Sequence, residues 1–165
     1  MTRSLLGATW DPVCGEMVPE GAHSWTHRHI KYSFCSDHCR ERFQRWPHLY
    51  VGEATFGLAE GQLGTSVPKS HTIVLAEAPS AEEALHLSEA LAALKGVDEV
   101  RFDGERALVH YDLMQVSLAD IEKAIITEAG GLRQRISDRV ERALIHYSEE
   151  CELDNLSHLA AHYRP

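Results

Sequence analysis

The fold of the N-terminal part of this chain is decided by residues 30–47, which read IKYSFCSDHCRERFQRWP. Apolar residues at 30, 32 and 34 alternate with polar ones, which predicts a short strand. Ser36 is a suitable N-cap, so we expect a helix over residues 37–46 that Pro47 ends. A turn-forming stretch precedes this strand. Together with the strand and the helix it predicts a small ββα module over residues 8–51.

Three of the four cysteines lie in this module. Cys14 sits in Asp11-Pro12-Val13-Cys14-Gly15, where the proline fixes one backbone angle and the glycine permits a positive one, as a tight metal-binding turn requires. Cys35 ends the predicted strand, and Cys39 falls in the first turn of the predicted helix. Free N–H groups and the helix dipole at that position favour thiolate over thiol.

The spacing Cys-x20-Cys-x3-Cys supplies three soft ligands. Such a set suits trigonal copper(I), or tetrahedral zinc(II) if a fourth ligand joins. The candidates for the fourth ligand are His38, followed by His27 and His29. The alternative is that these cysteines are simply buried small apolar residues.

These residues resemble a known family of metal-binding modules, the YHS domains, which are related to the TRASH modules. The resemblance covers about residues 10–51 and rests on Asp11-Pro12-Val13-Cys14-Gly15, Tyr32, Phe34-Cys35-Ser36, Cys39, Phe43, Pro47 and Tyr50. Such modules are found at the ends of heavy-metal P-type ATPases and in metal sensors. The resemblance therefore implies heavy-metal binding through Cys14, Cys35 and Cys39.

The aromatic residues of the module allow a second interpretation, a stacking surface for single-stranded nucleic acid. We expect them to form its core instead, because a module of about forty residues has little else to bury. The net charge of −9 also argues against nucleic acid as a partner, since phosphate binding depends on clustered Lys and Arg.

The rest of the chain has a different composition and predicts a second unit. Residues 1–50 hold six Lys/Arg and five Asp/Glu, whereas residues 51–165 hold ten and twenty. Glycines and Pro68 make residues 52–69 a predicted linker. Strands are expected at 71–77, 97–102, 107–111 and 132–136, with helices capped by Ser80 and Ser117. This βαββαβ order predicts a ferredoxin-like sandwich over residues 70–136, and an α+β fold overall.

This second unit resembles a heavy-metal-associated domain, the fold of small copper chaperones. That family carries a Cys-x-x-Cys pair in its first loop, but residues 77–82 contain no cysteine. The resemblance thus implies a degenerate copy that acts as scaffold or interaction surface.

The tail, residues 137–165, has a helical pattern with a break predicted near Asp154. Val140, Leu144, Tyr147 and Cys151 form one apolar stripe, expected to pack on the sandwich or on another subunit, with Cys151 as a packed cysteine. His158 and His162 are four residues apart and form a weaker candidate metal pair.

We therefore expect a cytoplasmic, soluble metal-binding protein without enzymatic activity or membrane insertion. Its role would be that of a chaperone, buffer or sensor for copper(I) or zinc(II). Its expected partners are the heavy-metal ion, a metal-transporting ATPase or another metal-handling protein, and a second copy bound through the C-terminal helices. The competing hypothesis is a protein-interaction module with a purely structural zinc.

Overall fold

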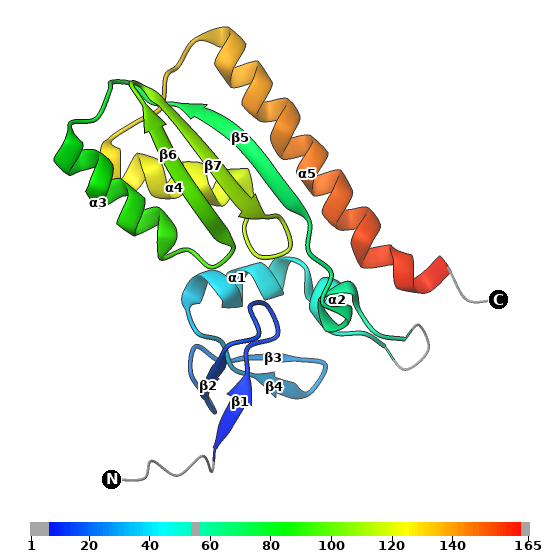
Figure 1. The fold of residues 1–165 in the computed structure, drawn as a ribbon. Coiled ribbons are helices and arrows are strands. Elements are labelled where there is room, and N and C mark those ends of the chain that lie inside the picture. The colour runs from blue at the N-terminus through cyan, green and yellow to red at the C-terminus, as the bar shows by residue number, and fades with distance from the viewer. Residues whose placement is uncertain (1–6, 54–56, 163–165) are drawn as a thin grey trace, which may run out of the picture. The chain divides into compact units, whose positions relative to one another are not determined.

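The structure, a computed structural model, describes residues 7–53 and 57–162 and has a mixed α+β fold (Figure 1). The chain divides into two compact units. The first contains residues up to Thr65 together with those from Asn155 onward, and the second contains Ser66–Asp154. The division between Thr65 and Ser66 falls within the predicted linker. No helix in the described ranges is long and apolar enough to cross a membrane.

The first unit contains two hairpins followed by helices. β1 (Ala8–Trp10) pairs with β2 (Met17–Pro19), and β3 (Trp25–His27) pairs with β4 (Ile30–Tyr32). The helices are α1 (Asp37–Arg45), α2 (Pro47–Tyr50) and the 3-10 helix η1 (Glu60–Leu63). The sequence predicted only one hairpin and one helix. Pro47 ends α1 as expected but also begins α2, because proline is well suited to the first turn of a helix.

The core of the first unit is small and aromatic. Phe34, Phe43 and Tyr50 are almost completely buried, and the ring of Phe43 lies 5.2 Å from that of Phe34. Arg42 is also buried and donates from Nε to the Tyr50 hydroxyl at 3.2 Å. The expected aromatic core is therefore present, except that Trp25 is exposed on β3.

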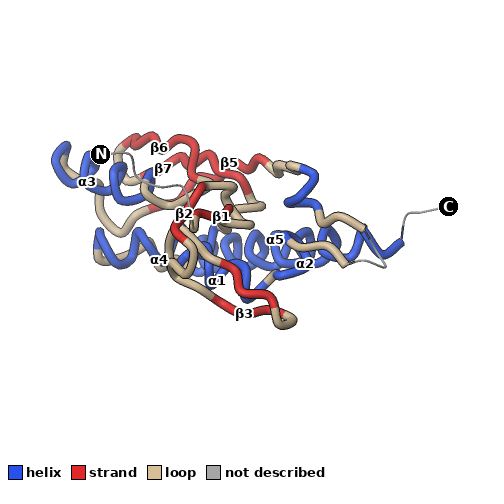
Figure 2. The backbone as a smooth tube through the Cα atoms, turned by 90° about the horizontal axis from the view of Figure 1, so that it is seen from below, coloured by secondary structure: helices blue, strands red, loops and turns tan. Residues whose placement is uncertain are grey.

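The second unit is built around one antiparallel sheet. Its elements are β5 (Pro68–Val74), α3 (Ala81–Ala92), β6 (Val97–Asp103), β7 (Arg106–Asp112), α4 (Leu118–Ala129) and, as far as Asp154, α5 (Ile136–His162). The strand order is β5-β7-β6. Ser80 and Ser117 cap α3 and α4 with reciprocal side-chain bonds, as predicted. Apolar side chains of β5 and β7 pack against α3 and α4, and Figure 2 shows α4 and α5 on the same side of this sheet.

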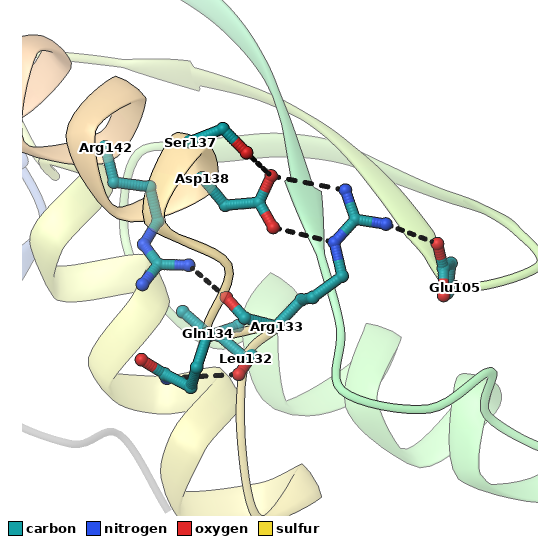
Figure 3. A network of polar contacts seen from close by, with 7 residues as sticks. All are labelled: Glu105, Leu132, Arg133, Gln134, Ser137, Asp138 and Arg142. Atoms are coloured by element: carbon teal, nitrogen blue, oxygen red, sulfur yellow. Dashed lines mark hydrogen bonds and ion pairs between the residues drawn. The ribbon is translucent and has the colours of Figure 1, made fainter.

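The fourth strand, predicted at 132–136, is not present as a strand. Leu132 makes a single antiparallel bridge with Leu75, beyond the end of β5. The carbonyls of Leu132 and Arg133 instead accept side-chain bonds from Gln134 (3.1 Å) and Arg142 (3.0 Å), as Figure 3 shows. The chain then enters α5 at Ile136. The sheet therefore has three strands, and the predicted βαββαβ order is reduced to βαββα with a residual bridge.

Figure 3 also shows the ion pairs that hold the start of α5. The Arg133 guanidinium bonds Asp138 in the first turn of α5 at 2.7 Å and Glu105 at 2.7 Å. Because Glu105 lies in the β6–β7 turn, the arginine connects the helix start to the sheet. The helical state of residues 136 onward is thus supported by contacts that a strand there would lose.

Helix α5 is continuous through Asp154, so the predicted break is wrong. One of its faces packs within the second unit: Ile145 contacts the core, and Glu152 pairs with Lys69 at 2.6 Å. The predicted apolar stripe lies elsewhere on the helix surface and is exposed. Cys151 is exposed with it, contrary to the expectation of a packed cysteine.

The buried carboxylate of Glu149 joins α5 to two other elements. It accepts hydrogen bonds from the Tyr111 hydroxyl on β7 and from the Leu118 N–H at the start of α4 (2.9 Å). Burial, followed by this bond, raises the pKa of Tyr111, which therefore stays a donor. The negative charge is also favourable at the N-terminus of α4.

We expect Glu149→Ala to reduce the free energy of unfolding by about 2–4 kcal/mol, because it leaves two buried donors without an acceptor. Urea unfolding of the full chain measures this change. Glu141→Ala, at an exposed position of the same helix, should change the free energy by less than about 0.5 kcal/mol. Equal losses in the two variants would contradict this account of how α5 is attached.

Candidate metal centre

Cys14 is presented by a tight turn between β1 and β2. The Gly15 N–H donates to the Asp11 carbonyl at 2.9 Å, and the Asp11 N–H donates to the Glu16 carbonyl at 2.8 Å. Gly15 has φ of 72°, the positive value that its sequence context predicted. The turn therefore holds the Cys14 side chain at its tip, where it is half-buried.

Cys35 and Cys39 are positioned by the start of α1. Ser36 is the N-cap, and its hydroxyl accepts from the Cys39 N–H at 3.3 Å, which confirms the predicted cap. The Sγ atoms of Cys35 and Cys39 are 3.5 Å apart, and those of Cys14 and Cys35 are 3.6 Å apart. Cys39 is buried, whereas Cys35 is partly exposed. The three thiols thus converge although 20 residues separate Cys14 from Cys35.

Asp11 completes the cluster and ties its two halves together. Its side chain is 1% exposed. Oδ1 accepts from the Val13 N–H at 2.8 Å and Oδ2 accepts from the Cys35 N–H at 2.8 Å. The ligand-type atoms of Asp11, Cys14, Cys35 and Cys39 all lie within 4.8 Å of one another, a group that could hold a metal ion.

None of the three histidines proposed as fourth ligand belongs to this group. His27 lies on β3 with its ring against Phe43 and His48, at 5.9 and 6.2 Å between centroids. His29 is exposed in the β3–β4 turn, and His38 is half-buried on α1 beside Cys39 in sequence. The sequence interpretation missed Asp11 as a member of the cluster. The Asp-Pro pair signals a turn, and such an aspartate commonly bonds the N–H two residues on, as it does here with Val13.

The weaker histidine pair lies on the last turns of α5. His158 is exposed, and its Nδ1 lies 3.1 Å from the Ser157 hydroxyl. The side chain of His162 lies outside the described residues.

The three thiols have different acidities. A hydrogen bond from Cys39, assisted by the Glu16 N–H, lowers the pKa of Cys14 to about 7 against the opposing effect of burial. Burial raises the pKa of Cys35 to about 11. The pKa of Cys39 is raised as well, first because its proton is shared with Cys14 and then by burial. Above pH about 7 the metal-free cluster therefore holds one thiolate, on Cys14, and two protons, on Cys35 and Cys39.

This distribution predicts how metal affinity depends on pH. Thiolate is the binding form, so an arriving ion must displace the protons of Cys35 and Cys39. Between pH about 7 and about 11 the apparent affinity should rise by about 100-fold per pH unit, and more steeply below about 7, where Cys14 is also protonated. Competition with a chromophoric chelator, corrected for the chelator's own protonation, measures the slope. An affinity that does not change with pH in this range would contradict the assignment of ligands.

Comparison of the chain with protein-family models, with curated proteins and with solved structures gives no match. The functional argument therefore depends on the geometry and chemistry of the cluster.

Proposed function

We propose that this protein binds one soft heavy-metal ion, copper(I) or zinc(II), through Cys14, Cys35 and Cys39, and that it carries, buffers or senses this ion. The observation that supports this most directly is the convergence of three thiols and the Asp11 carboxylate within 4.8 Å. Three sulfur donors in one place select soft and borderline metals over magnesium and calcium, which prefer oxygen.

Asp11 helps to distinguish the two metals. Both of its oxygens already accept a backbone N–H, so its first role is to hold the Cys14 turn against the start of α1. In that role the site offers three sulfurs, which suits copper(I). Each carboxylate oxygen retains a second lone pair, so Asp11 can also provide the fourth ligand that zinc(II) takes.

The site also fits a YHS-like module, which we propose for residues 8–51. The second unit we propose to be a shortened relative of the heavy-metal-associated domains. Its β5-β7-β6 order and two packed helices support this, and its fourth strand is represented by the Leu75–Leu132 bridge. Because the loop before α3 contains no cysteine, this unit would act as scaffold rather than as a second copper site.

A second candidate function is a protein-interaction module with a structural zinc. The cluster joins the β1–β2 turn to the start of α1 within a unit that has few large buried side chains, as structural zinc sites often do. Against it, Cys14 and Cys35 are partly exposed, which favours exchange of the ion.

Elemental analysis of the full chain purified without added metal would identify the ion, and exchange kinetics would separate the two functions. For a transfer or buffering site we expect loss of the ion to a competing thiol chelator within minutes. Retention of zinc over hours at the same chelator excess would favour the structural site. In the cell, we propose the cytoplasm, where thiols stay reduced, and a metal-transporting ATPase or another metal-handling protein as the exchange partner.

A further inference from the structure

Helix α5 carries an apolar stripe that has no covering in the described structure. Its members recur at intervals of three and four residues: Ile136, Val140, Leu144, Tyr147 and Cys151. Residues of an α-helix follow one another at about 100°, so the five fall within an arc of about 80°. Ile136 is 80% exposed, Leu144 64% and Tyr147 68%. Ile145 and Glu149, which attach the helix to the second unit, lie on the opposite side.

The charged residues beside the stripe are arranged so that two α5 helices can pair in the antiparallel direction. One flank carries Arg139 near the N-terminal end, then Ala143, then Glu150. Asp154 continues the stripe itself two turns after Tyr147. In an antiparallel pair of two α5 helices, the same flanks face each other. Arg139 of each copy then lies at the level of Asp154 of the other, within one turn of Glu150.

The apolar residues are matched in the same arrangement. If Leu144 of one copy lies opposite Tyr147 of the other, Val140 lies opposite Cys151. A parallel pair would instead place Asp154 against Asp154, which is unfavourable because like charges repel. We propose that the stripe Ile136–Cys151 is the interface of a homodimer in which two α5 helices pack antiparallel.

The size of the stripe sets the expected affinity. From Ile136 to Cys151 the helix rises about 23 Å. Contacts of this extent fall among the smaller specific interfaces, so we expect a dissociation constant in the micromolar range. The stripe Ile136–Cys151 contains none of the residues of the metal cluster.

Sedimentation equilibrium of the full chain, kept reduced, tests the proposal over concentrations from about 1 to about 200 µM. The mass should rise from the 18.5 kDa monomer toward twice that value. Leu144→Glu should keep the chain monomeric throughout. Leu85→Glu, the same change at a leucine of α3 that is 62% exposed, should leave the dimer unchanged. A wild-type chain that stays monomeric, or dimers that withstand Leu144→Glu, would overturn the proposal.

Charge reversal tests the antiparallel direction. Arg139→Glu and Asp154→Arg should each weaken the dimer by about fivefold, the combined effect of disrupting the two symmetry-related, partly exposed ion pairs. The double variant should recover most of the lost affinity, because both pairs are re-formed in the opposite sense while Glu150 is unchanged. Circular dichroism of each variant checks that α5 still forms. Failure of the double variant to restore binding, with α5 intact, would rule out the antiparallel arrangement.

Discussion

Removal of the metal is expected to unfold the first unit and leave the second folded. The first unit buries few large side chains besides Phe34, Phe43, Leu49 and Tyr50, and a core of this size barely offsets chain entropy. Structural zinc in comparably small units supplies on the order of 10 kcal/mol at neutral pH, as much as the whole stability of a typical small domain. Amide hydrogen exchange before and after chelation should show loss of protection over residues 30–46.

The second unit provides the internal control for this experiment. Leu87 and Leu91 of α3 pack into a core that contains no cysteine, so protection of α3 should not change on chelation. Lowering the pH should have the same effect as chelation on residues 30–46, because protons compete with the ion for the thiolates. If residues 30–46 remain protected after complete chelation, the first unit is stable without metal and the ion is cargo alone.

Replacement of any one of the three clustered cysteines by serine is expected to weaken metal binding by more than about 100-fold. Changes in groups that only support a ligand already weaken binding by about 10- to 100-fold, and loss of a ligand should exceed this. Competition titration measures the change. Cys39→Ser should have the largest effect, because Cys39 is the buried member and the serine hydroxyl must also lose its hydration.

Cys151→Ser is the matched control, since the fourth cysteine is exposed on α5. Its affinity for the metal should equal that of the wild type. Asp11→Asn tests whether Asp11 binds the ion or only holds the cluster together. If its carboxylate only accepts the Val13 and Cys35 N–H groups, the affinity for the metal should fall by about 10-fold. The affinities for copper(I) and zinc(II) should then fall alike. Wild-type affinity in all three cysteine variants would disprove the proposed site.

Local signals in the sequence were sufficient for most of the helices and strands. Ser36, Ser80 and Ser117 cap the helices that they were predicted to cap, because a side-chain oxygen at that position satisfies N–H groups that the helix leaves free. The fourth strand of the second unit could not be judged in this way. Residues 132–136 alternate as a strand does, but Arg133 contacts Arg142 in the following helix and Glu105, 28 residues earlier, and these contacts end the extended segment early.

The candidate site was likewise only partly predictable from local signals in the sequence. Cysteine spacing and turn chemistry were enough to select Cys14, Cys35 and Cys39. The position of Asp11 depends on an N–H 24 residues away, and no local pattern reports such a bond. The exposure of the α5 stripe was likewise open from sequence, because an apolar helical face indicates burial without saying what covers it.

The separation of the cysteines also sets an order of events for the ion. Cys35 lies just before the N-cap of α1 and Cys39 lies in its first turn, so in the proposed function these two would form a preformed pair of ligands, whereas Cys14 belongs to another loop. An acceptor protein that offers its own thiolate could therefore replace Cys14 first, while Cys35 and Cys39 still hold the ion. Hand-over would proceed through a shared intermediate in which the ion is never released to water. In such a pathway the rate of hand-over would be set by how readily the 11–15 turn moves aside.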